Sequence, residues 1–328
     1  MTDGPAITAA ALILEATFGY PDALLRRIGH PVMWVGALIA ALDRRLNDSA
    51  ATARRRRVAG VATLALALAA GLIQAAMITA VMRAAAGRYA WLPLGLLAST
   101  LLASRSLHRH VADVGAALMA GGPAAGRIAV AHIVGRDPEQ LDTAAILRAA
   151  IESLAENASD GVVAPAFWCA IGGLPGIVAY KVANTADSMI GHLNARHADF
   201  GRAAARFDDA VNLIPARLSA VWLILAAATM RDATAHGAWR VMRRDGRLHR
   251  SPNAGWPEAA MAGALGLRLG GPRVYGEEVV AGVWLGDGRT EATPVDLDRA
   301  LRLYRRVCAL QIAATLAVAI VMAFIAQW

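Results

Sequence analysis

The chain has 328 residues, of which 57% are hydrophobic and 18% are charged, and its mean hydropathy is +0.43. Soluble globular domains carry about 25% charged residues, so this much apolar surface excludes an ordinary soluble fold and predicts a lipid environment. The net charge of +8 does not indicate nucleic-acid binding, because the arginines flank apolar stretches and only 5% of the residues are aromatic. We expect an all-α, polytopic integral-membrane helical bundle with cytoplasm-facing helical loops, forming a single domain over residues 1–328.

The first third of the chain contains three predicted membrane segments. Residues 6–18 are apolar except for Glu15 and lack the basic region that precedes a cleaved signal, so we interpret them as a retained first segment. Residues 58–81 form the clearest span, because their length exceeds the ~20 residues that cross hydrocarbon. The arginines at positions 54–57 precede this span and predict that it begins in the cytoplasm. Residues 89–103 are then expected to return across the membrane.

Glycine and proline interrupt the next apolar segment. Residues 104–160 are mixed polar with a helical rhythm and are expected on the cytoplasmic side. Residues 161–182 are apolar, but a straight helix is weakened by the glycines and prolines within them. These are Pro165, Gly172, Gly173, Pro175 and Gly176. A helical hairpin or re-entrant segment is favoured, since irregular backbone at membrane depth must be covered by protein.

Two further spans are predicted at residues 212–230 and 307–327. The arginine-rich stretch 231–250 leaves two topologies open. If residues 212–230 cross outward, these arginines lie outside, against the charge rule. Either residues 161–182 cross fully, or residues 212–230 lie shallowly in the interface.

Three acidic side chains share one face of a predicted helix. Glu152, Glu156 and Asp160 are spaced i, i+4 and i+8, so about 3.6 residues per turn places them in one stripe, with Asn157 beside it. Like charges at this spacing destabilise a helix by roughly 0.2–0.5 kcal/mol per pair, which a cation or arginines would relieve. A solvated helix face is the ordinary alternative. The stripe runs into an apolar segment, where desolvated carboxylates are unfavourable, so we favour a functional role.

Lys181 is the only lysine of the chain. A compact ammonium group suits phosphate contact, although a chain this rich in arginine also retains one lysine by chance. Asn184, Asp187 and Ser188 follow within one helical turn and offer the hard oxygen ligands that Mg²⁺ prefers. This stretch is therefore a candidate phosphate and metal site.

A pair of aspartates follows in a third polar stretch. Asp208 and Asp209, with Asn212 one turn later, are suitable Mg²⁺ ligands. Arg206 and Arg217 on either side would neutralise phosphate charge. Adjacent aspartates alone are more typical of a protein surface. Three acidic and amide clusters in one membrane protein nevertheless predict a metal–phosphate site at the cytosolic rim, where we expect the three stretches to converge.

A fourth stretch, Ser-Pro-Asn-Ala-Gly at residues 251–255, leads into a glycine-rich run over residues 269–276. Turns of this composition present backbone N–H groups to anions. A tight loop with a capped helix after it is the equal alternative. Asn253 is the candidate substrate contact of this stretch.

Together these stretches resemble the adenosylcobinamide-phosphate synthase (CobD/CbiB) family. The residues that carry the resemblance are, in chain order, His30-Pro31-Val32 with Gly36, Gly135-Arg136-Asp137, residues 152–161, Ala164-Pro165, residues 172–176, Tyr180-Lys181, residues 184–191, residues 205–209, Asn212, residues 215–217 and residues 251–255. They extend over nearly the whole chain, and the central run is highly specific.

The resemblance implies an ATP- and Mg²⁺-dependent ligase of cobalamin biosynthesis in the inner (plasma) membrane, with its active site facing the cytoplasm. Members join a propionate carboxylate of the corrinoid adenosylcobyric acid to the amine of (R)-1-amino-2-propanol O-phosphate, or of the free aminopropanol. The product is adenosylcobinamide phosphate, and the carboxylate is activated most simply as an acyl phosphate. Membrane lipid is an expected partner and nucleic acid is not, while a homo-oligomer is left open.

Roles for individual residues are assigned as a hypothesis. The catalytic candidates, as metal ligands or general bases, are Glu152, Glu156, Asp160, Asp187 and Asp208. The metal ligands are Asp187, Asp208 and Asp209. The substrate and phosphate contacts are Lys181, Arg206, Arg217, Asn157, Asn184, Asn212 and Asn253.

Two other classes of protein share some of these features. A Mg²⁺-dependent membrane transferase acting on a prenyl or lipid diphosphate also uses aspartate clusters. Such enzymes typically repeat Asp-rich motifs on separate helices, unlike the Asn-Thr-Ala-Asp-Ser and Ser-Pro-Asn stretches here. A non-catalytic signalling homologue would be favoured by loss of the aspartates, which are present in this chain.

Overall fold

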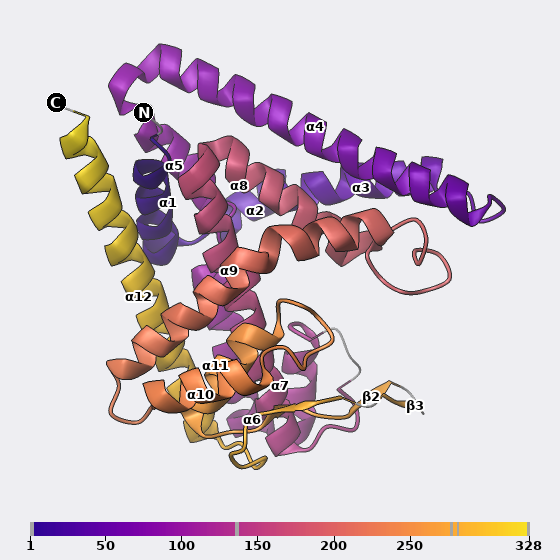
Figure 1. Cartoon of the computed structure of the whole chain (residues 1–328), viewed down its shortest axis with the longest axis vertical. Coiled ribbons are helices and arrows are strands. Elements are labelled where there is room, and N and C mark those ends of the chain that lie inside the picture. Colours follow the sequence, from indigo (N-terminus) through magenta and orange to yellow (C-terminus); the bar gives the residue numbers. More distant parts are fainter. Residues whose placement is uncertain (1–2, 135–137, 276–277, 281, 327–328) are drawn as a thin grey trace. The chain divides into compact units, whose positions relative to one another are not determined.

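The computed structural model describes residues 3–134, 138–275, 278–280 and 282–326 (Figure 1). Residues Gly135, Arg136 and Asp137, which contribute to the family resemblance, lie outside the described residues. The first helices are α1 (Gly4–Phe18), α2 (Asp22–Ile28), α3 (Pro31–Leu46), α4 (Ala53–Ala86), η1 (Gly87–Tyr89), α5 (Trp91–Ser99) and α6 (Ser104–Ala131). They are followed by α7 (Thr143–Ala158), η2 (Ser159–Val163), α8 (Ala164–Ile190), α9 (Arg202–Ala228), α10 (Ala235–Asp245), α11 (Gly255–Leu265) and α12 (Pro294–Ile325).

Four short strands, which the sequence did not predict, lie between α11 and α12. They are β1 (Leu269–Gly270), β2 (Arg273–Tyr275), β3 (Glu278–Val280) and β4 (Trp284–Leu285). β1 pairs with β4 and β2 pairs with β3, both antiparallel. They are two small ribbons on an otherwise helical chain.

Five helical stretches of the described chain are long and apolar enough to cross a membrane. They are Ala53–Tyr89, Trp91–Ala131, Thr143–Ile190, Arg202–Ala228 and Pro294–Ile325. The prediction of an all-α, polytopic membrane protein is confirmed. The spans predicted at residues 58–81, 212–230 and 307–327 overlap α4, α9 and α12.

Two helices in the predicted membrane segments, α1 and α5, are each too short to span a bilayer alone, although α5 begins the candidate span Trp91–Ala131. α1, which covers residues 6–18, has 15 residues, and α5 provides only 9 helical residues within the predicted segment 89–103. About 20 apolar residues are needed to cross hydrocarbon. α1 ends because the backbone turns at Gly19, whose φ of 65° lies in the left-handed region.

The chain folds into two compact units. Unit 1 contains Met1–Ala103, Ala164–Asn212 and Ile312–Trp328, and unit 2 contains Ser104–Val163 and Leu213–Gln311. Each unit draws on distant parts of the sequence, so neither corresponds to one half of the chain. The expectation of a single domain stays a prediction.

Within unit 1, α8 is folded back on itself. It packs against α1, α3, α4 and α5. Gly173, with φ 60° and ψ −146°, and the following Pro175 break the helix. A Cβ at Gly176 would lie 2.1 Å from the carbonyl oxygen of Trp168, whereas eight residues of a straight helix rise about 12 Å. The two arms therefore touch at the bend visible in Figure 1, as expected of the predicted hairpin.

Within unit 2, glycine allows α10 and α11 to approach closely. A Cβ at Gly237 would lie 2.5 Å from the Gly263 carbonyl oxygen, and a Cβ at Gly263 would lie 2.3 Å from the Gly237 carbonyl oxygen. Val241, Ala259 and Leu285 form a small buried apolar cluster beside this contact. α11 also packs against α7, and α7 packs against α6. Bare backbones thus replace side chains where these two helices cross.

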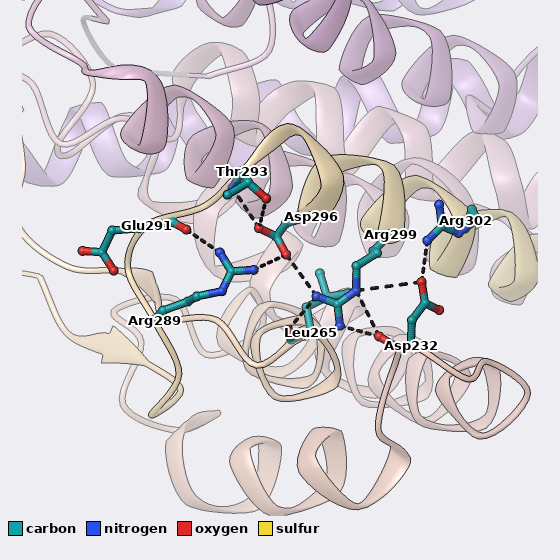
Figure 2. A network of polar contacts seen from close by, with 8 residues as sticks. All are labelled: Asp232, Leu265, Arg289, Glu291, Thr293, Asp296, Arg299 and Arg302. Carbon is teal, nitrogen blue, oxygen red and sulfur yellow. Dashed lines mark hydrogen bonds and ion pairs between the residues drawn. The ribbon is translucent and has the colours of Figure 1, made fainter.

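A buried carboxylate fixes the start of α12 in unit 2 (Figure 2). Asp296, 1% exposed, accepts hydrogen bonds from the backbone N and Oγ1 of Thr293 at 2.8 and 2.6 Å, which caps the helix. Its Oδ1 accepts from Arg299 Nη1 at 3.0 Å and pairs with Arg289. Arg299 Nη1 also donates to the Leu265 carbonyl at 3.1 Å. Asp296 therefore joins the first turn of α12 to the preceding loop and to the end of α11.

Replacing Asp296 by Ala is expected to lower the free energy of unfolding by about 3 kcal/mol, because two arginines lose their buried partner. The change is measured as the thermal unfolding midpoint of the protein in detergent micelles. Asp298→Ala is the matched control, since Asp298 is exposed two residues away, and surface changes usually stay within about 0.5 kcal/mol. Equal midpoints for the two variants would contradict the role given to Asp296.

Candidate functional site

Within unit 1, α8 and the first part of α9 bring three of the predicted aspartates together. Asp187 lies on α8, and Asp208 and Asp209 lie on α9. Asp187 interacts electrostatically with both Asp208 and Asp209. The structure thus places the Asn-Thr-Ala-Asp-Ser stretch beside the Phe-Asp-Asp stretch, while the roles of these residues stay predictions.

Asp208 is the most deeply buried of the three, with 8% of its surface exposed. Its Oδ2 accepts a hydrogen bond from Asn212 Nδ2 at 3.0 Å. Its Oδ1 is buried and has no hydrogen-bond partner in the part of the chain that the structure describes. A buried carboxylate oxygen without a donor is unfavourable unless a cation or a ligand donor meets it.

Asn212 is occupied by protein contacts. Its Nδ2 also donates to the Asp208 carbonyl oxygen at 3.1 Å, and its Oδ1 accepts from the Tyr180 hydroxyl at 3.1 Å. Both polar atoms of the amide are therefore used to hold Asp208 and to join α9 to α8. This geometry lets Asn212 position the Asp208 carboxylate, and its predicted contact with substrate stays a prediction. Asn184, by contrast, is only partly buried and lies beside the Asp208 carboxylate.

The carboxylate of Asp187 lies against a bare backbone. Gly191 N donates to the Asp187 carbonyl oxygen at 2.7 Å. A Cβ at Gly191 would lie 1.9 Å from Asp187 Oδ1. Only glycine fits at position 191 while Asp187 keeps this orientation. The family resemblance included Gly191, but sequence reasoning gave it no role.

The segment that links α8 to α9 is clamped to α3 by a carboxylate. Asp43 Oδ2 accepts from Arg196 Nη2 and Nε at 2.7 and 3.2 Å, and Asp43 Oδ1 accepts from Asn47 Nδ2 at 2.8 Å. Asn47 Nδ2 also donates to the Arg196 carbonyl oxygen at 3.0 Å. Burial raises the pKa of Asp43, but the hydrogen bonds from Asn47 and Arg196 outweigh it and hold the pKa below its ordinary value.

The link is also held against α4. Arg57 Nε donates to Asp199 Oδ1 at 2.8 Å, and a Cβ at Gly60 would lie 1.7 Å from the Phe200 carbonyl oxygen. Sequence reasoning missed these clamp residues, because their partners lie far apart along the chain and leave no periodic pattern. The clamp keeps the ends of α8 and α9 in fixed register, and with them Asp187 and Asp208.

Lys181 and Arg206 supply the positive charges predicted for this unit. Lys181 is partly buried on α8, and Arg206 is exposed on α9. Lys181 interacts with His30, whose pKa is lowered by burial and by the charge of Lys181. His30 Nδ1 accepts from Val32 N at 3.2 Å and caps α3. Tyr20 packs edge-on against the His30 ring, with centroids 4.6 Å apart.

The predicted acidic stripe lies in unit 2 and does not form one exposed face. Glu152 is 5% exposed, and its Oε1 accepts from Gly270 N at 2.8 Å, which fixes β1 to α7. Glu156 and Asn157 are exposed, and Asn157 Nδ2 donates to the Ser153 carbonyl oxygen at 2.9 Å. Asp160 lies beyond α7 in the π-helical turn η2, whose wider winding alters the helical register. The three acids therefore do not continue as one stripe on a regular α-helix, and they differ in exposure.

Arg217 and Asn253 also belong to unit 2. The Arg217 guanidinium lies over the Trp256 ring, 4.4 Å from its centroid. Asn253 is 6% exposed in a tight loop where Ser251 Oγ accepts from the backbone N of Asn253 and Ala254, both at 3.2 Å. α11 follows at Gly255, and its N-cap residue Ala254 makes no side-chain cap hydrogen bond, so the tight loop is observed without the expected helix cap. That these residues form one site with Asp187 and Asp208 stays a prediction.

Within the described ranges, no group of three or more His, Cys, Asp or Glu residues is arranged to hold a metal ion. Among those residues, protein side chains alone do not form a metal site. Mg²⁺ is usually bound by one or two carboxylates together with substrate phosphates and water. The unpaired Oδ1 of Asp208 beside Asp187 fits that second arrangement. Asp187, Asp208 and Asp209 remain the predicted ligands.

Known proteins show where the chain belongs. The family model described as CobD/Cbib protein matches residues 8–304. The chain belongs to this family. It is 49% identical over 312 residues to the "Cobalamin biosynthesis protein CobD" of Rhodobacter capsulatus, covering 93% of this chain and 94% of the relative. A Brucella suis protein of the same name is 47% identical over 321 residues, covering 97% and 98%.

A third CobD relative, from Sinorhizobium sp, is 45% identical over 317 residues and covers 96% of this chain and 98% of the relative. No solved structure matches the chain. Membership of the CobD/Cbib family confirms the resemblance seen in the sequence. It also confirms the enzyme assignment, that of an adenosylcobinamide-phosphate synthase family member.

The Asp43 clamp predicts a pH-dependent stability. Because the folded-state pKa of Asp43 is lowered, its ionised form stabilises the fold above the unfolded-state pKa of about 3.9, and this is lost as the pH falls through the folded-state value. Asp43→Asn should therefore lower the melting temperature at pH 7, and its difference from the parent protein should shrink below about pH 4. Melting curves in detergent from pH 7 to pH 3 measure this.

Asp48→Asn is the control for the clamp, since Asp48 is exposed in the loop after α3. It should follow the parent curve across the range. A difference between Asp43→Asn and the parent that stays constant down to pH 3 would show that the Asp43 charge does not stabilise the fold.

Proposed function

We propose that this chain forms the amide bond between a propionate carboxylate of adenosylcobyric acid and the amine of (R)-1-amino-2-propanol O-phosphate, or of the free aminopropanol. The reaction uses ATP and Mg²⁺, and the phosphorylated amine gives adenosylcobinamide phosphate. Membership of the CobD/Cbib family supports the pathway. The observation that supports the chemistry is the buried Oδ1 of Asp208, which lacks a hydrogen-bond partner in the described chain and lies beside Asp187.

Amide formation from a carboxylate requires an oxygen to leave. The amine nitrogen bonds to the carbonyl carbon, one carboxylate oxygen departs with a phosphoryl group drawn from ATP, and the amine loses its proton. Mg²⁺, when bound, neutralises phosphate charge and orients the phosphates for this transfer. The protein must therefore hold a cation beside phosphates, supply positive charge to them and accept a proton.

The residues of unit 1 suit the first two of these tasks. Asp187 and Asp208 offer carboxylate oxygens for the cation, and Asp209 lies within their electrostatic reach. Lys181, partly buried on α8, and Arg206, exposed on α9, supply positive charge for phosphate. Asn212 and Tyr180 keep the Asp208 carboxylate in place.

The proton acceptor is proposed among the acids of unit 2. Glu156 is exposed and Asp160 is partly exposed at the end of α7 and in η2. Glu152 is a weaker candidate, because one of its carboxylate oxygens already accepts from the Gly270 backbone. A general base must reach the proton that it removes, and an accessible carboxylate meets that need better than a buried one.

We further propose that the enzyme lies in the inner membrane with its active site in the cytoplasm. Five helical stretches of the described chain suit membrane crossing. Arg54, Arg55, Arg56 and Arg57 precede the apolar part of α4, and arginines beside a span favour the cytoplasmic side. Adenosylcobyric acid, ATP and the aminopropanol would reach the site from that side.

Replacing Asp208 by Asn is expected to reduce amide formation about 100-fold or more, because it removes a preorganised charge from the cation site while preserving the shape of the side chain. Purified protein is incubated with adenosylcobyric acid, ATP, Mg²⁺ and the aminopropanol, phosphorylated or free. The amide is measured by mass spectrometry. Asp187→Asn is expected to act in the same direction.

Asp113→Asn is the matched control for these substitutions, since Asp113 is exposed on α6. It should retain full activity. Unchanged melting temperatures show that each variant is folded. Full activity in Asp208→Asn would exclude Asp208 from the reaction, and absence of the amide with the parent protein would overturn the proposed function.

A further inference from the structure

The guanidinium groups of two arginines lie against the Trp256 ring in unit 2. The Cζ atoms of Arg217 and Arg247 lie 4.4 and 5.9 Å from the centroid of its ring. The two positive charges also act on each other. Contact between a cation and an aromatic face is favourable, because the ring quadrupole attracts positive charge. The ring therefore helps to hold two like charges close together, an arrangement that a bound anion would stabilise.

Among the residues that the structure describes, no carboxylate forms an ion pair with either arginine. Other arginines of unit 2, such as Arg240 and Arg244, form ion pairs with aspartates. None of the ion pairs in the described part of the chain includes Arg217 or Arg247. The Arg217 side chain donates one hydrogen bond, from Nη1 to the Leu213 carbonyl at 2.6 Å. The remaining donors of the planar guanidinium are available to a ligand.

The position of Arg217 within the chain also indicates a functional role for its charge. It lies within α9, a helix apolar enough to cross a membrane, and it is only partly exposed. A charged side chain in such a helix is unfavourable unless water, a partner or a ligand meets it, and it commonly marks a functional site.

The Trp256 ring is a preformed platform. Its Nε1 donates to the Pro252 carbonyl at 3.1 Å. A Cβ at Gly246 would lie 3.3 Å from two carbons of the indole, so the ring packs closely on the backbone at the end of α10. The preceding turn is closed by Ser251 Oγ, which accepts from Asn253 N at 3.2 Å. The Ser-Pro-Asn-Ala-Gly stretch thus fixes the ring against which both arginines lie.

We propose that Arg217 and Arg247, held against Trp256, bind the phosphoryl group of a phosphate-bearing ligand. Two guanidinium groups match the double negative charge of a phosphate, and their planar forks bind its oxygens in pairs. The inference rests on the proposed function where it names the source, because that reaction uses phosphate-bearing soluble substrates. An anionic lipid headgroup also presents a phosphate, as a phosphodiester with a single negative charge.

The test measures binding in the absence of Mg²⁺ and of any reaction. Radiolabelled inorganic pyrophosphate is equilibrated by dialysis with the full-length protein in detergent. Arg217→Gln and Arg247→Gln are each expected to weaken binding about tenfold, or about 1.4 kcal/mol. Arg243→Gln is the matched control, because Arg243 lies 5.5 Å from the Trp239 ring in the same unit. It should bind pyrophosphate like the parent protein.

A second arm separates the two sources of phosphate. The same proteins are reconstituted with phosphatidylglycerol, and the lipid retained after detergent extraction is counted by native mass spectrometry. Loss of pyrophosphate binding alone identifies a soluble ligand, and loss of phosphatidylglycerol alone identifies a lipid headgroup. Equal behaviour of all four proteins in both arms would overturn the proposal.

Two further measurements keep the result independent of folding and of the reaction. Arg217→Lys and Arg247→Lys retain the charge without the planar fork, so they should lose about threefold in affinity at an unchanged melting temperature. If the protein binds pyrophosphate through these arginines but makes no amide, the proposed function fails and this inference stands. If it makes the amide but none of the arginine variants loses binding in either arm, this inference alone fails.

Discussion

The contact between α8 and α9 in unit 1 is the constraint on which the proposed chemistry depends. Asp187, Asp208 and Asp209 act on one another electrostatically there, and like charges that lie close together repel one another. The protein holds the arrangement by other means. Asn212 bridges Tyr180 and Asp208, and the Asp43 clamp fixes the segment between the two helices. Such organisation resembles a site built to receive a positive group.

Arginine is used in two different ways in unit 2. At the start of α12, Arg289 and Arg299 satisfy the buried Asp296, and this network is structural (Figure 2). Around Trp256, Arg217 and Arg247 have an aromatic face in place of a carboxylate. The first arrangement is complete without a ligand, whereas the second retains charge and hydrogen-bond donors for one. Arginine thus stabilises the fold around Asp296, whereas around Trp256 it is proposed to bind a ligand.

Much of the helical framework was predictable from the sequence, because it follows from local composition. The long apolar runs gave α4 and α12, and Gly173 with Pro175 gave the fold-back of α8. The predicted segment 6–18 lies within α1, whereas the predicted segment 89–103 contains the short helix α5 and the turns that flank it. The β1–β4 ribbon was missed, since strands of two residues carry no alternating pattern.

The candidate site was predictable in its residue types but not in its contacts. Asp187 and Asp208 were identified from oxygen-rich clusters, and the structure brings them together. Glu152 and Glu156 were both predicted as catalytic candidates, yet the Glu152 carboxylate accepts a hydrogen bond from the Gly270 backbone. The ion pair between Asp43 and Arg196 was not predicted, because the two residues lie far apart in the sequence. Patterns along a helix report which side chains share a face, whereas pairing across the fold depends on tertiary packing.

The central claim is that Asp208 holds a divalent cation together with nucleotide phosphate. It is tested most directly by electron paramagnetic resonance of Mn²⁺ in place of Mg²⁺, titrated with ATP into the parent protein and into Asp208→Asn. The account predicts a bound Mn²⁺ with phosphorus hyperfine coupling in the parent, and binding weakened at least about tenfold in the variant, or about 1.4 kcal/mol. Equal Mn²⁺–ATP binding by both proteins would contradict it.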